Sequence, residues 1–201
     1  MATVLSPAPA PPPVSTGPTR HVWTVAEFHT VNSTGVWAGR RPVLLRGVVW
    51  EQGPMNPPHA LGVELLVEAL RAVFTVGWRV RMQLPLVLGL DTDPFPDVAV
   101  VPGSPRDFAT RHPTTAALVV EVSDTTLALD LTVKAELYAA SGIADYWVLD
   151  LNARTLHVLR DPRPVAAGGH SYRDVRVLGP ADSVAPLAAP AGLVAVADLL
   201  P

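Results

Sequence analysis

The order of apolar and polar residues along the chain predicts helices and strands in succession. Residues 57–74 repeat apolar side chains every three or four positions, which is the spacing of one buried helix face. Residues 78–83 instead alternate, so Trp78, Val80 and Met82 should share the apolar side of a strand. We expect the helix face to consist of six residues: Leu61, Leu65, Leu66, Ala69, Leu70 and Val73.

Shorter patterns predict the remaining elements. Before residue 57 they predict a short helix capped by Thr24 and Glu27 and two strands around Gly47. After residue 83 they predict strands over 97–101 and 116–123, a helix over 129–142 that ends at Gly142, and a hairpin that turns at Asn152 and Ala153. Strands and helices that mix in this way predict an α/β domain. We expect a central mixed sheet with helices on its faces.

Composition limits the classes of protein to which the chain can belong. Its 201 residues suit one domain, and 49% of them are hydrophobic, so a sizeable core is available. Because the chain has no cysteine, disulfide frameworks and thiolate metal sites are excluded. No apolar run reaches the ~18 residues of a membrane helix, and the first residues lack the features of a secretory signal. We therefore expect a cytoplasmic protein that makes no membrane contact.

The first twenty residues differ in composition from the rest. Residues 1–20 hold six prolines among alanine, serine and threonine, with almost nothing to bury in a core. The sequence therefore predicts a disordered Pro/Ala-rich tail over residues 1–20 and a folded domain over residues 21–201.

The charge balance and several absent motifs narrow the function. The formal net charge is −3, whereas proteins that hold DNA by bulk electrostatics are usually basic. An enzyme that contacts DNA through one local patch remains compatible with this charge. The sequence has no glycine-rich nucleotide loop and no G-x-S-x-G turn, and its six histidines show no pair at metal-binding helical spacing. Carboxylates are the groups that remain for a reactive site.

Asp97 and Glu121 are the carboxylates whose positions need an explanation. Asp97 opens an apolar strand, and Glu121 interrupts a strand that is apolar on both faces, as in a covered central strand. A turn-capping aspartate and a solvent-facing glutamate are the plain alternatives. A buried carboxylate costs several kcal/mol unless it has a partner. A divalent cation held between the ends of two strands would be such a partner.

Lys134 is the only lysine among the fifteen Lys and Arg residues of the chain. It follows the Glu121 strand on the predicted helix, where four-residue spacing places it on one face with Asp130 and Tyr138. A lysine ammonium is a compact charge whose pKa can shift, and arginine does not reproduce it. Lys134 is therefore a candidate for stabilising phosphate charge or positioning water. The alternative is an exposed helical ion pair with Asp130.

Five short motifs, in this order, resemble those of a known family. They read "GVVWEQGPMNPPHA", "PDVAVV", "VVEVSD", "DLTVKAELY" and "DYWVLD". Together they are similar to the Uma-type restriction endonucleases of the PD-(D/E)XK nuclease superfamily, and the resemblance extends over residues 23–201. In the standard pattern the lysine stands two residues after the glutamate. Ser123 stands there in this chain, and Lys134 resembles the migrated arrangement, with the lysine on the following helix.

The resemblance implies a restriction-endonuclease-like fold with an added N-terminal hairpin, and metal-dependent cleavage of phosphodiester bonds in DNA. It implies Asp97, Glu121 and Lys134 as catalytic residues, with Asp97 and Glu121 as ligands of Mg²⁺ or Mn²⁺. Because one site per chain would have to cut two strands, a homodimer is also expected.

The chain departs from the family pattern in its first hairpin. Val43 and Arg46 stand where members commonly have glutamate and aspartate, so a second metal would lack a ligand. Glu51 and His59 could substitute for the missing acidic residues or support the site. Tyr138 could belong to the site or to the core. The alternative function is therefore a catalytically decayed module of the same fold that binds nucleic acid or a protein partner.

Overall fold

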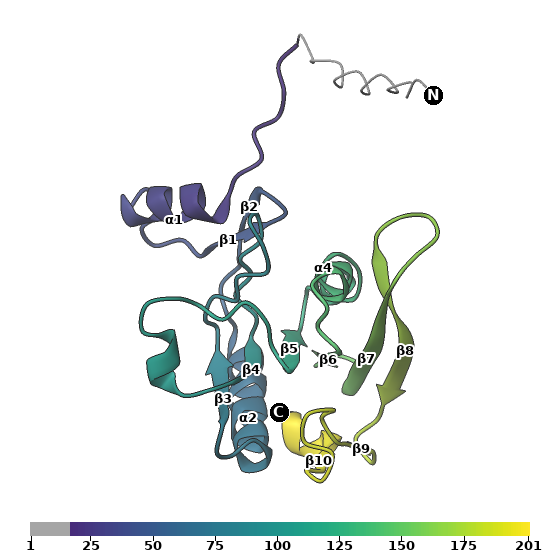
Figure 1. The fold of residues 1–201 in the computed structure, drawn as a ribbon. Coiled ribbons are helices and arrows are strands. Elements are labelled where there is room, and N and C mark those ends of the chain that lie inside the picture. Colours follow the sequence, from purple (N-terminus) through teal and green to yellow (C-terminus); the bar gives the residue numbers. More distant parts are fainter. Residues whose placement is uncertain (1–16) are drawn as a thin grey trace, which may run out of the picture.

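A computed structural model describes residues 17–201, and a six-stranded sheet forms their centre (Figure 1). The strands lie in the order β3-β4-β5-β6-β7-β8, and all neighbours are antiparallel except β5 and β6. Their bounds are β3 (Trp78–Met82), β4 (Val98–Pro102), β5 (Leu118–Ser123), β6 (Asp145–Asp150), β7 (Thr155–Pro164) and β8 (His170–Leu178). This mixed sheet confirms the expected fold class. Most of the predicted tail, residues 1–16, lies outside the described residues.

The other elements of residues 17–201 are helices, short helical turns and two short strand pairs. They are α1 (Val25–Ser33), β1 (Pro42–Leu45), β2 (Val48–Glu51), α2 (Pro57–Val73), η1 (Pro105–Phe108), α3 (Leu127–Leu129), η2 (Asp130–Lys134), α4 (Ala135–Ala140), β9 (Ser183–Val184), β10 (Val194–Ala195) and η3 (Val196–Leu199). The expected capping box of α1 is present, because Thr24 and Glu27 bond reciprocally. Within residues 17–201 no helix is both long and apolar enough to span a membrane.

Side chains of the central strands alternate between two cores. On one face, Val98 and Val120 pack with α2 and with residues near the C-terminus. On the other, Ala99 and Val119 pack with α4 and with apolar residues of the β1–β2 hairpin. Because both faces are covered, β5 is buried along its whole length. A polar residue on this strand is therefore buried too, and Glu121 lies on the same face as Val119.

The β1–β2 hairpin turns through Arg46 and Gly47, which both have positive φ, 50° and 69°. Two such residues are the signature of the type I′ turn, which matches the twist of paired strands. Gly47 also touches the chain ahead of α1, because its carbonyl accepts a hydrogen bond of 3.0 Å from the Trp23 amide. These contacts fix the hairpin above the sheet, where Figure 1 shows it beside α4.

The buried face of α2 differs from the expected one. Leu61 is 45% exposed, whereas Gly62 is buried in the contact with the sheet. A Cβ atom at Gly62 would lie 3.2 Å from Val122 Cγ1, so the absent side chain lets α2 approach β5 closely. The helix is thereby rotated relative to the expected apolar stripe, and the face that it buries consists of Gly62, Val63, Leu66, Val67 and Leu70.

The alternation predicted for residues 78–83 fails at its end. Met82 is 47% exposed, and Arg81 is 8% exposed. The guanidinium of Arg81 lies 5.1 Å from the centre of the Phe108 ring and donates a hydrogen bond to the Pro85 carbonyl. β3 is an edge strand, so Met82 lacks a covering layer, while Arg81 finds an aromatic partner.

Gly47→Ala should destabilise the fold more than Gly35→Ala. Both glycines have positive φ, and an alanine there costs about 1–2 kcal/mol. A Cβ atom at Gly35 meets nothing within 4 Å, whereas one at Gly47 would lie 3.1 Å from the Trp23 amide nitrogen. Urea unfolding of both variants measures the difference. Equal losses of stability would show that the segment ahead of α1 does not pack closely enough on Gly47 to exclude a methyl group.

Candidate active site

The antiparallel register of β4 and β5 brings Asp97 beside Glu121. Val98 pairs with Val120, so Asp97, one residue earlier, lies opposite Glu121 on the neighbouring strand. The Asp97 amide donates a hydrogen bond of 3.4 Å to Glu121 Oε2, and the Val122 amide donates one of 2.9 Å to Asp97 Oδ2. Both acids are buried. Strand pairing, rather than flexible side chains, places the two carboxylates together.

Asp97 is held by side chains from two further elements. His59 Nε2, in the first turn of α2, lies 3.1 Å from Asp97 Oδ1, and Gln83 Nε2 donates to the same oxygen at 3.1 Å. Burial raises the pKa of Asp97, but the hydrogen bond and charge of His59, the hydrogen bond from the Val122 amide and the charge of Lys134 together outweigh it, so the pKa lies below its usual value. The hydrogen bond with Asp97 raises the pKa of His59. Asp97 is therefore ionised and its carboxylate is fixed in orientation.

Glu121 contacts two residues of the segment that follows β5. The Tyr138 hydroxyl donates a hydrogen bond of 2.7 Å to Glu121 Oε1, and Lys134 Nζ lies 3.1 Å from Oε2. Burial raises the pKa of Glu121 to about 7, although the charge of Lys134 opposes this shift. The carboxylate is thus poised to ionise near neutral pH.

Lys134 also pairs with Asp130, which is buried, while the Lys134 side chain is 16% exposed. Lys134 Nζ lies 2.8 Å from Asp130 Oδ1, and Thr126 Oγ1 donates a hydrogen bond of 2.6 Å to Asp130 Oδ2. Burial alone would lower the pKa of Lys134, but the charges of Glu121 and Asp130 outweigh it and raise the pKa. The lysine is therefore a fixed cation. The expected helical pair with Asp130 is present, but it is not exposed.

The helix expected over residues 129–142 is interrupted at the site. Residues Asp130–Lys134 form a π-helical turn, in which the Ala135 amide bonds back to the Asp130 carbonyl five residues earlier. The same carbonyl accepts a hydrogen bond of 2.9 Å from the Tyr146 hydroxyl of β6. This wider turn carries both Asp130 and Lys134. Sequence periodicity does not distinguish it from a regular α-helical turn.

A cavity of about 200 Å³ opens above the acid pair. Asp97, Glu121 and Lys134 lie on its lining, and the β1–β2 hairpin supplies an apolar wall. Glu51 also lines the cavity, but its side chain is 57% exposed and lies 3.7 Å from Arg40. Of the three accessory candidates, His59 and Tyr138 thus contact the carboxylates, whereas Glu51 lies at the rim.

The hairpin positions that are commonly acidic in the family offer no carboxylate here. Val43 is buried and lines the cavity, while Arg46 forms an ion pair with Glu136 of α4. Across residues 17–201 no group of three or more His, Asp or Glu side chains is arranged to hold a metal.

Sequence reasoning missed Gln83 and Arg41. Gln83 follows β3 with a φ of 50°, and this left-handed backbone aims its amide at Asp97. Arg41 Nη2 donates a hydrogen bond of 3.2 Å to Gln83 Oε1, and both residues line the cavity. Neither residue stands in a recognisable motif, and strained backbone of this kind often occurs at functional sites.

Comparisons with known proteins agree with this architecture. The crystal structure of a putative nuclease from Anabaena variabilis matches with a TM-score of 0.64 and 17% sequence identity, over 88% of this chain and 97% of that one. At this identity the match shows the fold alone. No curated protein matches the chain. The family profile described as "Uma2: Putative restriction endonuclease" matches residues 26–198. Because this match covers most of its length, the chain belongs to the Uma2 family.

Proposed function

We propose that this protein is a metal-dependent endonuclease that hydrolyses phosphodiester bonds in DNA, with Asp97, Glu121 and Lys134 as its catalytic residues. The observation that carries the proposal is the contact of the only lysine of the chain with the buried Glu121 carboxylate, beside which strand pairing places Asp97. Membership of the Uma2 family supports the same conclusion. A purely structural role would not require three ionisable groups on the lining of one cavity.

Asp97 and Glu121 fit a hard divalent cation, Mg²⁺ or Mn²⁺. Magnesium is commonly bound through one or two carboxylates, with water and substrate phosphate as its other ligands. The two acids offer oxygen ligands only, and they meet at the cavity lining. When bound, the metal would polarise the phosphate and lower the pKa of a coordinated water.

The protein's own groups would hold the remaining charges in place. Lys134, fixed by Asp130, puts a permanent positive charge beside the acid pair, where it would stabilise negative charge that develops on the phosphate. His59 orients the Asp97 carboxylate, and Tyr138 orients that of Glu121. His59 and Tyr138 are therefore positioning residues in this proposal.

Asp97→Asn tests the proposal directly. The exchange keeps the side-chain shape but removes the charge that a cation needs, so Mn²⁺-dependent nicking of plasmid DNA should fall at least about a hundredfold. Mn²⁺ should raise the melting temperature of the wild type but not that of the variant, because a ligand of the native state stabilises it. Asp174→Asn, an exchange on the exposed part of β8, is the matched control and should behave as wild type.

One observation favours a second candidate function, a decayed nuclease module. Val43 presents an apolar side chain to the cavity where relatives commonly have an acid. If the wild type neither binds Mn²⁺ nor nicks DNA, while the fold melts cooperatively, the decayed module replaces the nuclease.

Lys134→Arg distinguishes a catalytic lysine from one that only neutralises its neighbours. Arginine keeps the positive charge, but its planar fork is larger and would displace the charge from its place between Glu121 and Asp130. We expect cleavage to fall about a hundredfold or more. The paired measurement is a thermal melt, which reports whether the buried pairs survive. A folded variant with full activity would assign Lys134 a structural role alone. Arg176→Lys, at an exposed position, controls for the exchange itself.

The raised pKa of Glu121 predicts a pH-dependent stability in the metal-free protein. A carboxyl group whose pKa rises from 4.5 to about 7 on folding stabilises the native state at low pH. That contribution is lost as the pH rises from about 4.5 to about 7. With EDTA present, the unfolding free energy of wild type relative to Glu121→Gln should therefore fall as the pH rises from about 4.5 to about 7. Other groups titrate in the same way in both proteins, so their contributions to this difference in unfolding free energy largely cancel. A pH-independent difference would contradict the raised pKa.

A further inference from the structure

We propose that this site takes single-stranded nucleic acid, with the Trp50 ring stacked on an unpaired base and Arg41 holding a neighbouring phosphate. This inference rests on the proposed nuclease function and deepens it, because it names the class of substrate that the site would cleave. It stands on four features of the described residues: the Trp50 ring, the wall that carries it, the charge of Arg41 and the depth of the acid pair.

Trp50 is an exposed tryptophan that has no aromatic partner within residues 17–201. The chain has five tryptophans. Trp147 is fully buried and bonded to Asp145, while Trp23, Trp37 and Trp78 each lie against another aromatic ring. Trp50 is 44% exposed, and among the aromatic pairs of residues 17–201 none includes it. Its ring is therefore available to a ligand.

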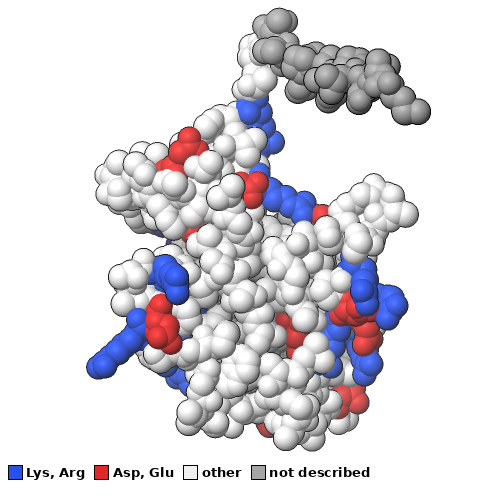
Figure 2. Space-filling model, viewed as in Figure 1, with Lys and Arg blue, Asp and Glu red and all other residues white. Residues whose placement is uncertain are grey.

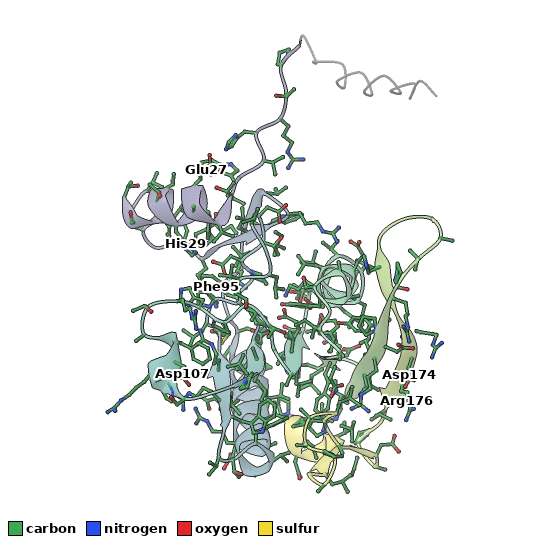
Figure 3. The ribbon with its side chains drawn as sticks, in the orientation of Figure 1. Glu27, His29, Phe95, Asp107, Asp174 and Arg176 are labelled. Atoms are coloured by element: carbon green, nitrogen blue, oxygen red, sulfur yellow. The ribbon has the colours of Figure 1, made fainter. Side chains whose placement is uncertain are left out.

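The hairpin places Trp50 on the wall of the cavity that contains the acid pair. Trp50 pairs across the strands with Val43, so both side chains lie on the same face of the hairpin. Met55 and Phe95 extend this apolar lining. Figure 3 labels Phe95 on the side of α1 that faces the sheet. An aromatic platform stacks on any base and contributes about 1–3 kcal/mol per base.

Arg41 supplies a positive charge beside this wall. It lines the cavity, and among the ion pairs of residues 17–201 none includes it. Within residues 17–201 its guanidinium donates a single hydrogen bond, to the neutral amide of Gln83, which in turn donates a hydrogen bond to Asp97. The neighbouring Arg40 differs, because it pairs with Glu51. The charge of Arg41 thus remains free for a phosphate close to the acid pair.

The depth of the site favours an unpaired strand over a duplex. Glu121 is 2% exposed, so a reacting phosphate must enter the cavity rather than rest on an open surface. The face in Figure 2 has no continuous basic surface of the kind that grips duplex phosphates. In a duplex, both faces of a base are stacked on neighbouring bases, so Trp50 could not stack on it. Enzymes that bind an individual base act on single strands or extrude the base from the duplex.

The test is equilibrium binding, measured by fluorescence anisotropy with EDTA and again with Ca²⁺. The probes are labelled DNA and RNA single strands of about 12 nucleotides and a blunt DNA duplex of the same sequence. Wild type should bind a single strand at least tenfold more tightly than the duplex. Trp50→Ala should weaken single-strand binding about tenfold or more, while Trp50→Phe should retain most of it. Val177→Ala, another exposed apolar residue, is the control and should change nothing.

The outcomes separate this inference from the nuclease proposal. Tight single-strand binding that depends on Trp50 supports the base platform, even if no metal produces cleavage and the nuclease proposal fails. Metal-dependent cleavage together with unchanged binding by Trp50→Ala overturns the platform and leaves the nuclease standing. Equal affinity for strand and duplex in both conditions also overturns it. Because Trp50 is partly exposed, its variants should melt as the wild type does, and melting curves check this.

Discussion

The ion pair of Lys134 with Glu121, completed by Asp130, is the interaction on which the buried face of the sheet depends. Glu121 lies on a central strand whose two faces are both covered, so water cannot solvate its charge. Removing one member of a buried pair costs about 3–5 kcal/mol, because it leaves an uncompensated charge in the core. The π-helical turn and its hydrogen bond from Tyr146 keep the lysine in this position. The contacts of Lys134 that compensate the buried charge of Glu121 therefore also fix the positions of the charges in the candidate active site.

The β1–β2 hairpin is fixed at its turn and forms one side of the candidate site. Its turn is set by Arg46 and Gly47, and Arg46 reaches across to Glu136 of α4. An apolar wall then faces the carboxylates, with Val43 and Trp50 side by side. Val43 offers no oxygen ligand to a cation, so this side of the cavity contributes apolar surface and no charge.

Much of the architecture could be predicted from the sequence. The capping box at Thr24, the two strands around Gly47 and the hairpin turn after β6 all follow from local chemistry, and the structure contains each. The positions of Asp97 and Glu121 on successive strands could also be predicted. Strand alternation assigns Glu121 to one face, and a two-residue period leaves no other choice. Motif order further assigned the chain to its family, as the profile match confirms.

The sequence by itself therefore determined the elements, their order and the candidate reactive residues, because periodicity and capping act over a few neighbouring positions. The tertiary structure decided how these elements meet. The rotation of α2 depends on the close approach of Gly62 to Val122, a contact between distant parts of the chain. The orientation of Asp97 depends on Gln83 and His59, which come from separate elements and stand in no common motif. The exposure of Trp50 arises in the same way, since only packing decides which apolar side chain is left without a partner.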